Sequence, residues 1–90
     1  MEINHNHQRQ RFTAFVDDRE VSLSYNLEDH LMNIIKVEVP VELRGQGLAE
    51  KITLHAFEHA KREGYKIIPT CPYVRDKFLK EHHEFDNLLN

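Results

Sequence analysis

The sequence predicts an α/β fold with a mixed sheet (α+β), in which an antiparallel meander is followed by a strand–helix–strand–helix unit. Apolar and polar residues alternate without a break through residues 21–27, as in a strand with one buried and one solvated face. Between residues 46 and 63 the apolar residues recur at helical spacing instead. A strand on each side of that helix implies a right-handed crossover, and therefore a parallel strand pair.

Three strands make up the predicted meander. Residues 11–16 are rich in β-forming side chains and end at Asp17 and Asp18, which suit a hairpin turn. Residues 21–27 form the second strand, and residues 31–39 form the third. Strands that follow one another so closely are expected to be neighbours in the sheet.

The third strand of the meander carries apolar residues on both faces. Simple alternation puts Met32 and Ile34 on one face and the other apolar side chains on the opposite face, namely Leu31, Ile35, Val37 and Val39. We therefore expect both faces to be covered near the middle of this strand.

The second half is predicted to contain a long helix, a short strand and a second helix. The long helix covers residues 46–63, and Gly64 stands where a left-handed cap would end it. Residues 66–70 form a short buried strand, and Pro72 suits the first turn of a helix over residues 72–82. The loops that follow the two parallel strands then meet at one edge of the sheet, where open sheets of this kind bind ligands.

Length and composition limit the classes of function. A chain of 90 residues with 40% hydrophobic residues predicts one domain over residues 1–90, without room for a second core. The net charge of -3 comes from interleaved acids and bases, which argues against nucleic acid or a membrane as the main partner. One cysteine excludes an internal disulfide, and the lack of a secretory or spanning apolar segment predicts a cytoplasmic protein. None of these patterns indicates an oligomeric state.

A glycine-containing segment before the long helix has the properties of a pyrophosphate site. Its residues are Arg44, Gly45, Gln46, Gly47, Leu48 and Ala49. Two glycines let the backbone approach a ligand closely, and the first amides of a helix lack intrahelical acceptors, so they attract anions. The segment does not fit a nucleoside triphosphatase loop, because Leu48 and Ala49 replace its lysine and hydroxyl residue, and it lacks the third glycine of the dinucleotide fingerprint. The alternative is a glycine-rich turn that only starts a helix.

This segment matches the RxxGxA form of the signature of the GCN5-related N-acetyltransferases, and Val39 and Pro40 precede its arginine at the spacing that this superfamily favours. Over nearly the whole chain the sequence resembles the small YjdJ-type branch, through Tyr25, His55-Ala56-Phe57, Ala60, Lys66–Pro69, Cys71-Pro72-Tyr73-Val74 and Glu81-His82-His83-Glu84-Phe85. Val37 and His83 depart from that branch, in which threonine and proline are expected. Neither departure falls in the phosphate loop.

The resemblance implies a minimal acetyltransferase fold that binds acetyl-coenzyme A (acetyl-CoA), with splayed parallel strands that admit the pantetheine arm. The backbone amides from Arg44 to Ala49 would hold the pyrophosphate, and the arginine side chain would add positive charge. The main chain of Val39 would face the pantetheine amide or the thioester carbonyl. An amine that the sequence does not identify would accept the acetyl group. The alternatives are a non-catalytic acyl-CoA sensor and a small protein-interaction module.

Two residues after the short strand are candidates for catalysis. Cys71 precedes Pro72 at the start of the last helix, where a helix dipole lowers the pKa of a thiol. It could act as a nucleophile or line the thioester end of the site, whereas lone cysteines are also common as small core residues. Tyr73 could protonate the departing CoA thiolate, or it could belong to the core.

The seven histidines do not predict a metal site. His55 and His59 are four residues apart on one helix face, but Glu58 adjoins the second histidine, unlike the HExxH motif, and no third ligand is evident. We therefore expect no bound metal.

Overall fold

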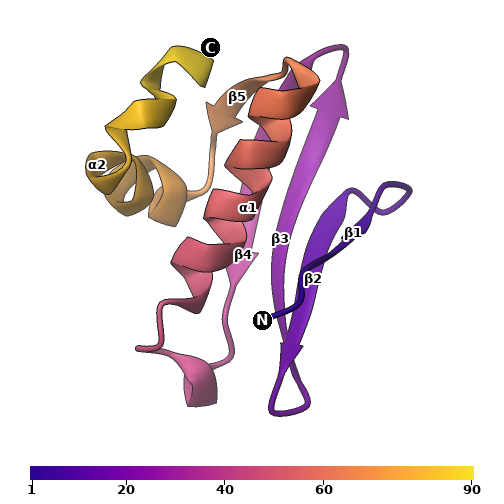
Figure 1. Cartoon of the computed structure of the whole chain (residues 1–90), viewed down its shortest axis with the longest axis vertical. Helices are drawn as coiled ribbons and strands as arrows, with labels where there is room; N and C mark the ends of the chain where they lie inside the picture. The colour runs from indigo at the N-terminus through magenta and orange to yellow at the C-terminus, as the bar shows by residue number, and fades with distance from the viewer.

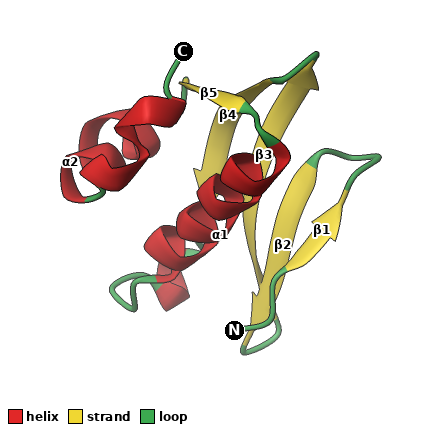
Figure 2. Cartoon of the chain, turned by 45° about the horizontal axis from the view of Figure 1, so that its top comes forward, coloured by secondary structure: helices red, strands yellow, loops and turns green.

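The computed structural model describes all 90 residues and confirms the predicted fold class. A five-stranded mixed sheet has the order β1-β2-β3-β4-β5, and helix α1 lies across one of its faces (Figures 1 and 2). The strands are β1 Asn4–Asn6, β2 Arg11–Val16, β3 Arg19–Glu28, β4 Leu31–Glu38 and β5 Lys66–Pro69. The helical segments are η1 Val41–Leu43, α1 Leu48–Glu63, η2 Val74–Phe78, α2 Leu79–Glu81 and η3 His83–Leu88. None of these helices is long and apolar enough to cross a membrane.

The predicted antiparallel meander is present as β2, β3 and β4. Phe12 pairs with Leu23, and Leu27 pairs with Met32. The turn between β2 and β3 lies at Asp17 and Asp18, which both have positive φ angles, 51° and 62°. This conformation matches the right-handed twist of a hairpin, so the turn expected from these residues is confirmed.

Strand β1 is not predicted by the sequence. Its three residues, Asn-His-Asn, are polar and give no alternating pattern, so nothing local predicts a strand. The strand is held by pairing with β2 and by the ring of His5, which stacks on Phe12 with 4.0 Å between centroids. Tertiary contacts therefore decide its conformation.

The prediction that both faces of β4 are covered is wrong, because a β-bulge changes which residues face α1. Ser24 pairs with Lys36 while Tyr25 pairs with Ile34, so Ile35 is the extra residue and is 38% exposed. Before the bulge, even-numbered residues of β4 face the core; after it, Val37 lies opposite the buried Leu23 and packs against the core. Only one face is covered.

Helix α1 begins at Leu48, two residues later than predicted. Gly47 has a left-handed φ of 74°, which no helical residue adopts, so the helix cannot start before it. The predicted end is confirmed, because Gly64 has a φ of 76° and its amide donates to the carbonyls of Ala60 and Lys61. The buried face of the helix packs over the sheet through residues that include Ile52 and others in the core.

Strands β4 and β5 form the predicted parallel pair and then separate. Their pairing runs from Leu31 with Lys66 to Ile34 with Pro69. The amide of Cys71 still donates to the carbonyl of Ile34 at 2.9 Å, but β4 continues to Glu38 without a β5 partner. The two strands therefore fork, as the resemblance implies, and the loop before α1 starts on one side of the fork.

The predicted second helix covers residues 72–81, one residue fewer than expected, and contains a π turn over Val74–Phe78. It ends because His82 leaves the helical conformation, with φ of -132° and ψ of 64°. Phe57 of α1 contacts Phe78 and Phe85, with 4.9 and 5.2 Å between ring centroids. This aromatic contact anchors the C-terminal segments beside α1, at the β5 edge of the sheet (Figure 2).

Candidate functional site

The loop before α1 presents a run of free backbone amides. Gly45 and Gly47 adopt left-handed φ angles of 86° and 74°, which turn the chain into the helix. The amide of Lys51 makes the first helical hydrogen bond, to the carbonyl of Gly47 at 3.1 Å. The amides of residues 45–50 donate to no protein acceptor, so they and the helix dipole form a site suited to an anion.

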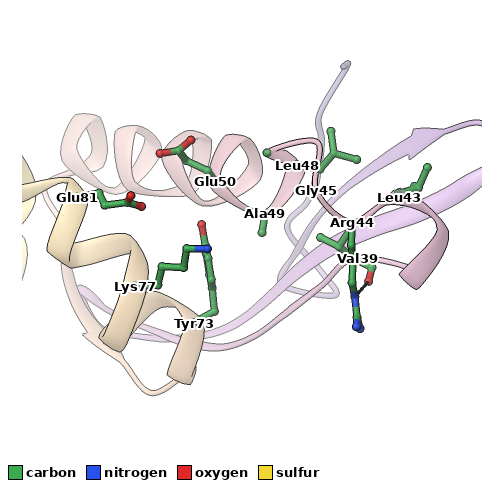
Figure 3. Close-up of a pocket in the computed structure, with 11 residues that line it drawn as sticks. Val39, Leu43, Arg44, Gly45, Leu48, Ala49, Glu50, Tyr73, Lys77 and Glu81 are labelled. Atoms are coloured by element: carbon green, nitrogen blue, oxygen red, sulfur yellow. Dashed lines mark hydrogen bonds between the residues drawn. The ribbon is translucent and has the colours of Figure 1, made fainter.

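A cavity of about 330 Å³ lies against this loop and is the one pocket of the structure. One side is formed by the end of β4, the loop and the first turn of α1, and the other by the helix over residues 72–81 (Figure 3). Its lining residues are Val39, Leu43, Arg44, Gly45, Gly47, Leu48, Ala49, Glu50, Tyr73, Lys77 and Glu81. The loop after β4 thus borders the cavity, whereas the segment after β5 reaches it only through Tyr73, in the first turn of the helix.

Most of the residues predicted to bind the cofactor line this cavity. The exception is Gln46, whose amide belongs to the free run but which is not among the lining residues. The amide of Arg44 is already used, because it donates to the carbonyl of Val41 at 3.3 Å. Arg44 can therefore offer a ligand its side chain but not its backbone, and Glu50 extends the free amides by one residue.

The side chain of Arg44 contacts the predicted pantetheine-binding residue. Its Nε donates to the carbonyl of Val39 at 3.3 Å, as the dashed line in Figure 3 marks. The bond is exposed to solvent and long for an N–H···O contact, so it is readily exchanged. The guanidinium is thus kept near the loop while it remains free to pair with an anion.

Tyr73 lies in the wall opposite the loop and has a perturbed phenol. Burial raises the pKa of Tyr73 to about 12, and the negative charges of Glu50 and Glu81 act in the same direction. The phenol therefore keeps its proton throughout the neutral range. A protonated phenol in this cavity can donate a hydrogen bond to a ligand.

Cys71 lies outside the lining of the cavity. Its side chain is 4% exposed and belongs to the hydrophobic core. Its backbone holds the fork together through the bond to Ile34, and its carbonyl accepts the amide of Arg75 at 3.0 Å. These contacts give Cys71 a packing role, and its catalytic role remains a prediction.

Sequence reasoning missed four residues of the cavity: Leu43, Glu50, Lys77 and Glu81. Tyr73, Lys77 and Glu81 are four residues apart, a spacing that places side chains along one helix face. That spacing was the available signal, but it does not say what the face meets. The helix packing decides that this face borders the cavity.

The histidines of α1 contact aromatic rings. His59 lies edge-on to His5, with 4.7 Å between ring centroids, and His5 Nε2 is hydrogen-bonded to Tyr25 Oη at 2.6 Å. No group of three or more His, Cys, Asp or Glu side chains is arranged to hold a metal ion.

The fold and this loop agree with the comparison to known families. Residues 11–88 match the family described as GCN5-related N-acetyl-transferase. The chain belongs to this family. The match covers the meander, the loop before α1, the fork and the helix that forms the far wall of the cavity, and it supports acetyltransferase activity as the functional class of this family member.

Relatives of this acetyltransferase-family chain occur among vertebrate proteins and solved structures. Protein NATD1 of Gallus gallus is 28% identical over 85 residues, which cover 91% of this chain and 76% of the relative. Protein NATD1 of Homo sapiens is 29% identical over 83 residues, covering 89% and 73%. The solution structure of a GCN5-like candidate N-acetyltransferase from Staphylococcus aureus superposes with a TM-score of 0.76 at 25% identity, covering 99% of this chain and 87% of that chain.

Proposed function

We propose that this protein binds acetyl-CoA and transfers its acetyl group to an amine. The observation that carries the proposal is the run of amides at residues 45–50, which have no protein acceptor and of which all but that of Gln46 belong to residues lining the cavity. Six unpartnered amides at a helix N-terminus suit a diphosphate bound mainly through the backbone. The guanidinium of Arg44 supplies a positive charge beside them.

The fork between β4 and β5 gives the rest of the ligand a place to bind. Beyond Ile34 the backbone of β4 has no β5 partner, so its polar groups on that side are open to a ligand. A pantetheine arm carries amides that can pair with such a strand edge. We assign the main chain of Val39, at the end of β4, to this contact, and we propose the YjdJ-type branch as the place of this chain within the family.

The proposed reaction uses Tyr73 at the leaving group. The amine nitrogen forms a bond with the thioester carbonyl carbon, and the carbon–sulfur bond breaks with its electron pair on sulfur. Tyr73 donates its phenolic proton to that sulfur and regains a proton from water, and the new amide nitrogen loses its proton to water. A pKa of about 12 lies above the roughly 8.5 of a cysteine-type thiol, so the transfer is uphill and the contribution of Tyr73 is modest.

Calorimetric titration and a transfer assay test the two parts of this function. We expect the wild type to bind acetyl-CoA and CoA, and Arg44→Ala to weaken both, while Arg62→Ala at the far end of α1 changes neither. A panel of polyamines, amino sugars and lysine peptides should reveal an acetylated product. Binding without any product would favour the acyl-CoA sensor, and absence of binding by the folded wild type would contradict the whole proposal.

Single substitutions then separate the two catalytic candidates. Tyr73→Phe should lower kcat by roughly 10- to 100-fold, at or below the usual contribution of a general acid. Cys71→Ala tests the nucleophile prediction, because an essential thiol would abolish transfer, whereas a packing residue would leave kcat unchanged in the folded protein.

A further inference from the structure

The wall of the cavity opposite the phosphate loop carries one cation. Tyr73, Lys77 and Glu81 line the cavity from the helix over residues 72–81, and the loop lines it from the other side. Figure 3 shows the side chain of Lys77 running from this helix into the cavity. Apart from Arg44 in the loop, Lys77 is the only basic residue of the lining.

A π turn aligns these three side chains. An α-helix has about 3.6 residues per turn, so a step of four residues rotates a side chain by slightly more than one full turn about the helix axis. The stretch Val74–Phe78 is π-helical and has more residues per turn, so the four-residue step from Tyr73 to Lys77 rotates the side chain by slightly less than one full turn. The α-helical step from Lys77 to Glu81 exceeds one full turn and compensates for this difference, which keeps Glu81 on the same helix face. Such π turns are frequent at functional sites.

If Lys77 were absent, the carboxylates that line the cavity would repel a bound anion. Glu50 and Glu81 both line the cavity, and Glu50 is held by His82, with 2.8 Å between Oε2 and Nε2. None of the ion pairs in the structure involves Lys77, so its ammonium is available to a ligand. A diphosphate bound to the loop amides would face two carboxylates, whose repulsion a nearby cation offsets.

We propose that Lys77 is a second phosphate-binding residue, whose ammonium pairs with the diphosphate of CoA from the side opposite the loop. The inference rests on the proposed function, because that function supplies the diphosphate. A compact ammonium on a flexible stem suits a phosphate whose exact position is set by other groups. Lys77 and the loop amides then hold the diphosphate between two elements that are far apart in the sequence.

Titrations with acetyl-CoA and dephospho-CoA test this role. Lys77→Met removes the charge and keeps most of the apolar stem, and we expect it to lower the affinity for both ligands roughly tenfold. The loss should shrink at high salt, because added ions screen the lost charge pair. Lys77→Arg should restore most of the affinity. Lys80→Met is the matched control, since Lys80 is exposed on the same helix and does not line the cavity.

The outcomes separate this inference from the function on which it rests. Equal affinity of Lys77→Met and the wild type would overturn the role of Lys77 while leaving acetyl-CoA binding intact. A loss confined to acetyl-CoA, with dephospho-CoA unaffected, would overturn the assignment to the diphosphate, because the two ligands share that group and only acetyl-CoA carries the 3′-phosphate. A loss that does not respond to salt would overturn the ion pair and indicate packing. Failure of the folded wild type to bind either ligand would refute the proposed function itself.

Discussion

Nε2 of His82 lies 2.8 Å from Oε2 of Glu50, so the C-terminal segment is joined to the first turn of α1 at the rim of the cavity. Nδ1 of the same imidazole lies 3.2 Å from Oε2 of Glu84, and its ring stacks on Phe78 with 4.3 Å between centroids. The hydrogen bond to Glu50, followed by that to Glu84, raises the pKa of His82. The contact therefore strengthens when the imidazole is protonated.

The first prediction concerns the pH dependence of this contact. The pKa of His82 is higher in the folded than in the unfolded state, where it is about 6.5, so its stabilisation is fully present below that pH. It is lost as pH rises through the folded value. We expect His82→Gln to lower the free energy of unfolding near pH 5.5 by less than about 1 kcal/mol, and by less still near pH 9.

Denaturant unfolding at the two pH values measures this difference. His83→Gln is the control for loss of one histidine from the same segment, since its ring is exposed and takes no part in the hydrogen bond to Glu50. A His82→Gln effect that grows with pH would contradict the ion-pair interpretation.

The second prediction concerns His5, whose titration acts in the opposite direction. Burial lowers the pKa of His5 to about 4, with further lowering by His7, His59 and His55. Its Nε2 lies within hydrogen-bond distance of the hydroxyl of Tyr25, whose own pKa is raised by burial. In the unfolded state His5 is protonated below about pH 6.5, whereas in the folded state it is protonated only below about pH 4.

The free energy of unfolding should therefore fall as pH drops through this window. His5→Gln keeps an acceptor for Tyr25 but cannot titrate, so its stability should fall less steeply between about pH 6.5 and pH 4. Equal slopes for this variant and the wild type, measured by denaturant unfolding at each pH, would show that His5 is not the titrating group.

The third prediction uses two glycines with matched backbones. Gly47 and Gly64 have φ angles of 74° and 76°, and a Cβ built on either meets no atom within 4 Å. Alanine at either position is strained by the left-handed conformation, and each variant should lose roughly 1 kcal/mol of stability. Only Gly47→Ala disturbs the free amides, so this variant alone should bind acetyl-CoA more weakly, by about tenfold or more.

Titration of both variants, together with their unfolding free energies, separates the effects. Comparable losses of affinity in both would mean that stability, and not the loop, governs binding. A Gly47→Ala protein with wild-type affinity would support the alternative that the loop only starts a helix.

The fourth prediction concerns a hydroxyl in the core. Thr53 on α1 is fully buried, and its Oγ1 has no hydrogen-bond partner. Valine has nearly the same shape and removes the unsatisfied oxygen, so Thr53→Val should raise the free energy of unfolding by about 1 kcal/mol. Thr53→Ser, which keeps the hydroxyl but leaves a space where the methyl was, should lower it. Destabilisation by valine would mean that the hydroxyl has an acceptor.

The elements that the sequence predicts correctly carry their pattern locally. The alternation of β3, the helical period of α1 and the glycine that ends it are each set by neighbouring residues. Strand β1 and the bulge at Ile35 depend on pairing with another strand. In β4 the residues that face the core are Met32 and Ile34 before the bulge and Val37 after it. A pattern of strict alternation cannot include a bulge, so it predicts a strand that is buried on both faces.

The candidate site divides in the same way. The loop from Arg44 to Ala49 is contiguous, so its glycines and the start of a helix locate the candidate anion site in the sequence, and its role in binding stays a prediction. The opposite wall comes from Lys77 and Glu81, which reach the cavity only because of the π turn and the packing of Phe78 against α1. Sequence spacing cannot show a contact of this kind.

A nitrogen–proton correlation spectrum of the labelled protein, recorded as CoA is added, tests the anion site most directly. The structure predicts that the largest amide shifts fall on residues 45–50, with smaller ones at Tyr73 and Lys77 in the opposite wall. Shifts confined to other parts of the chain, or an unchanged spectrum at millimolar CoA, would contradict the assignment of this loop as the diphosphate site.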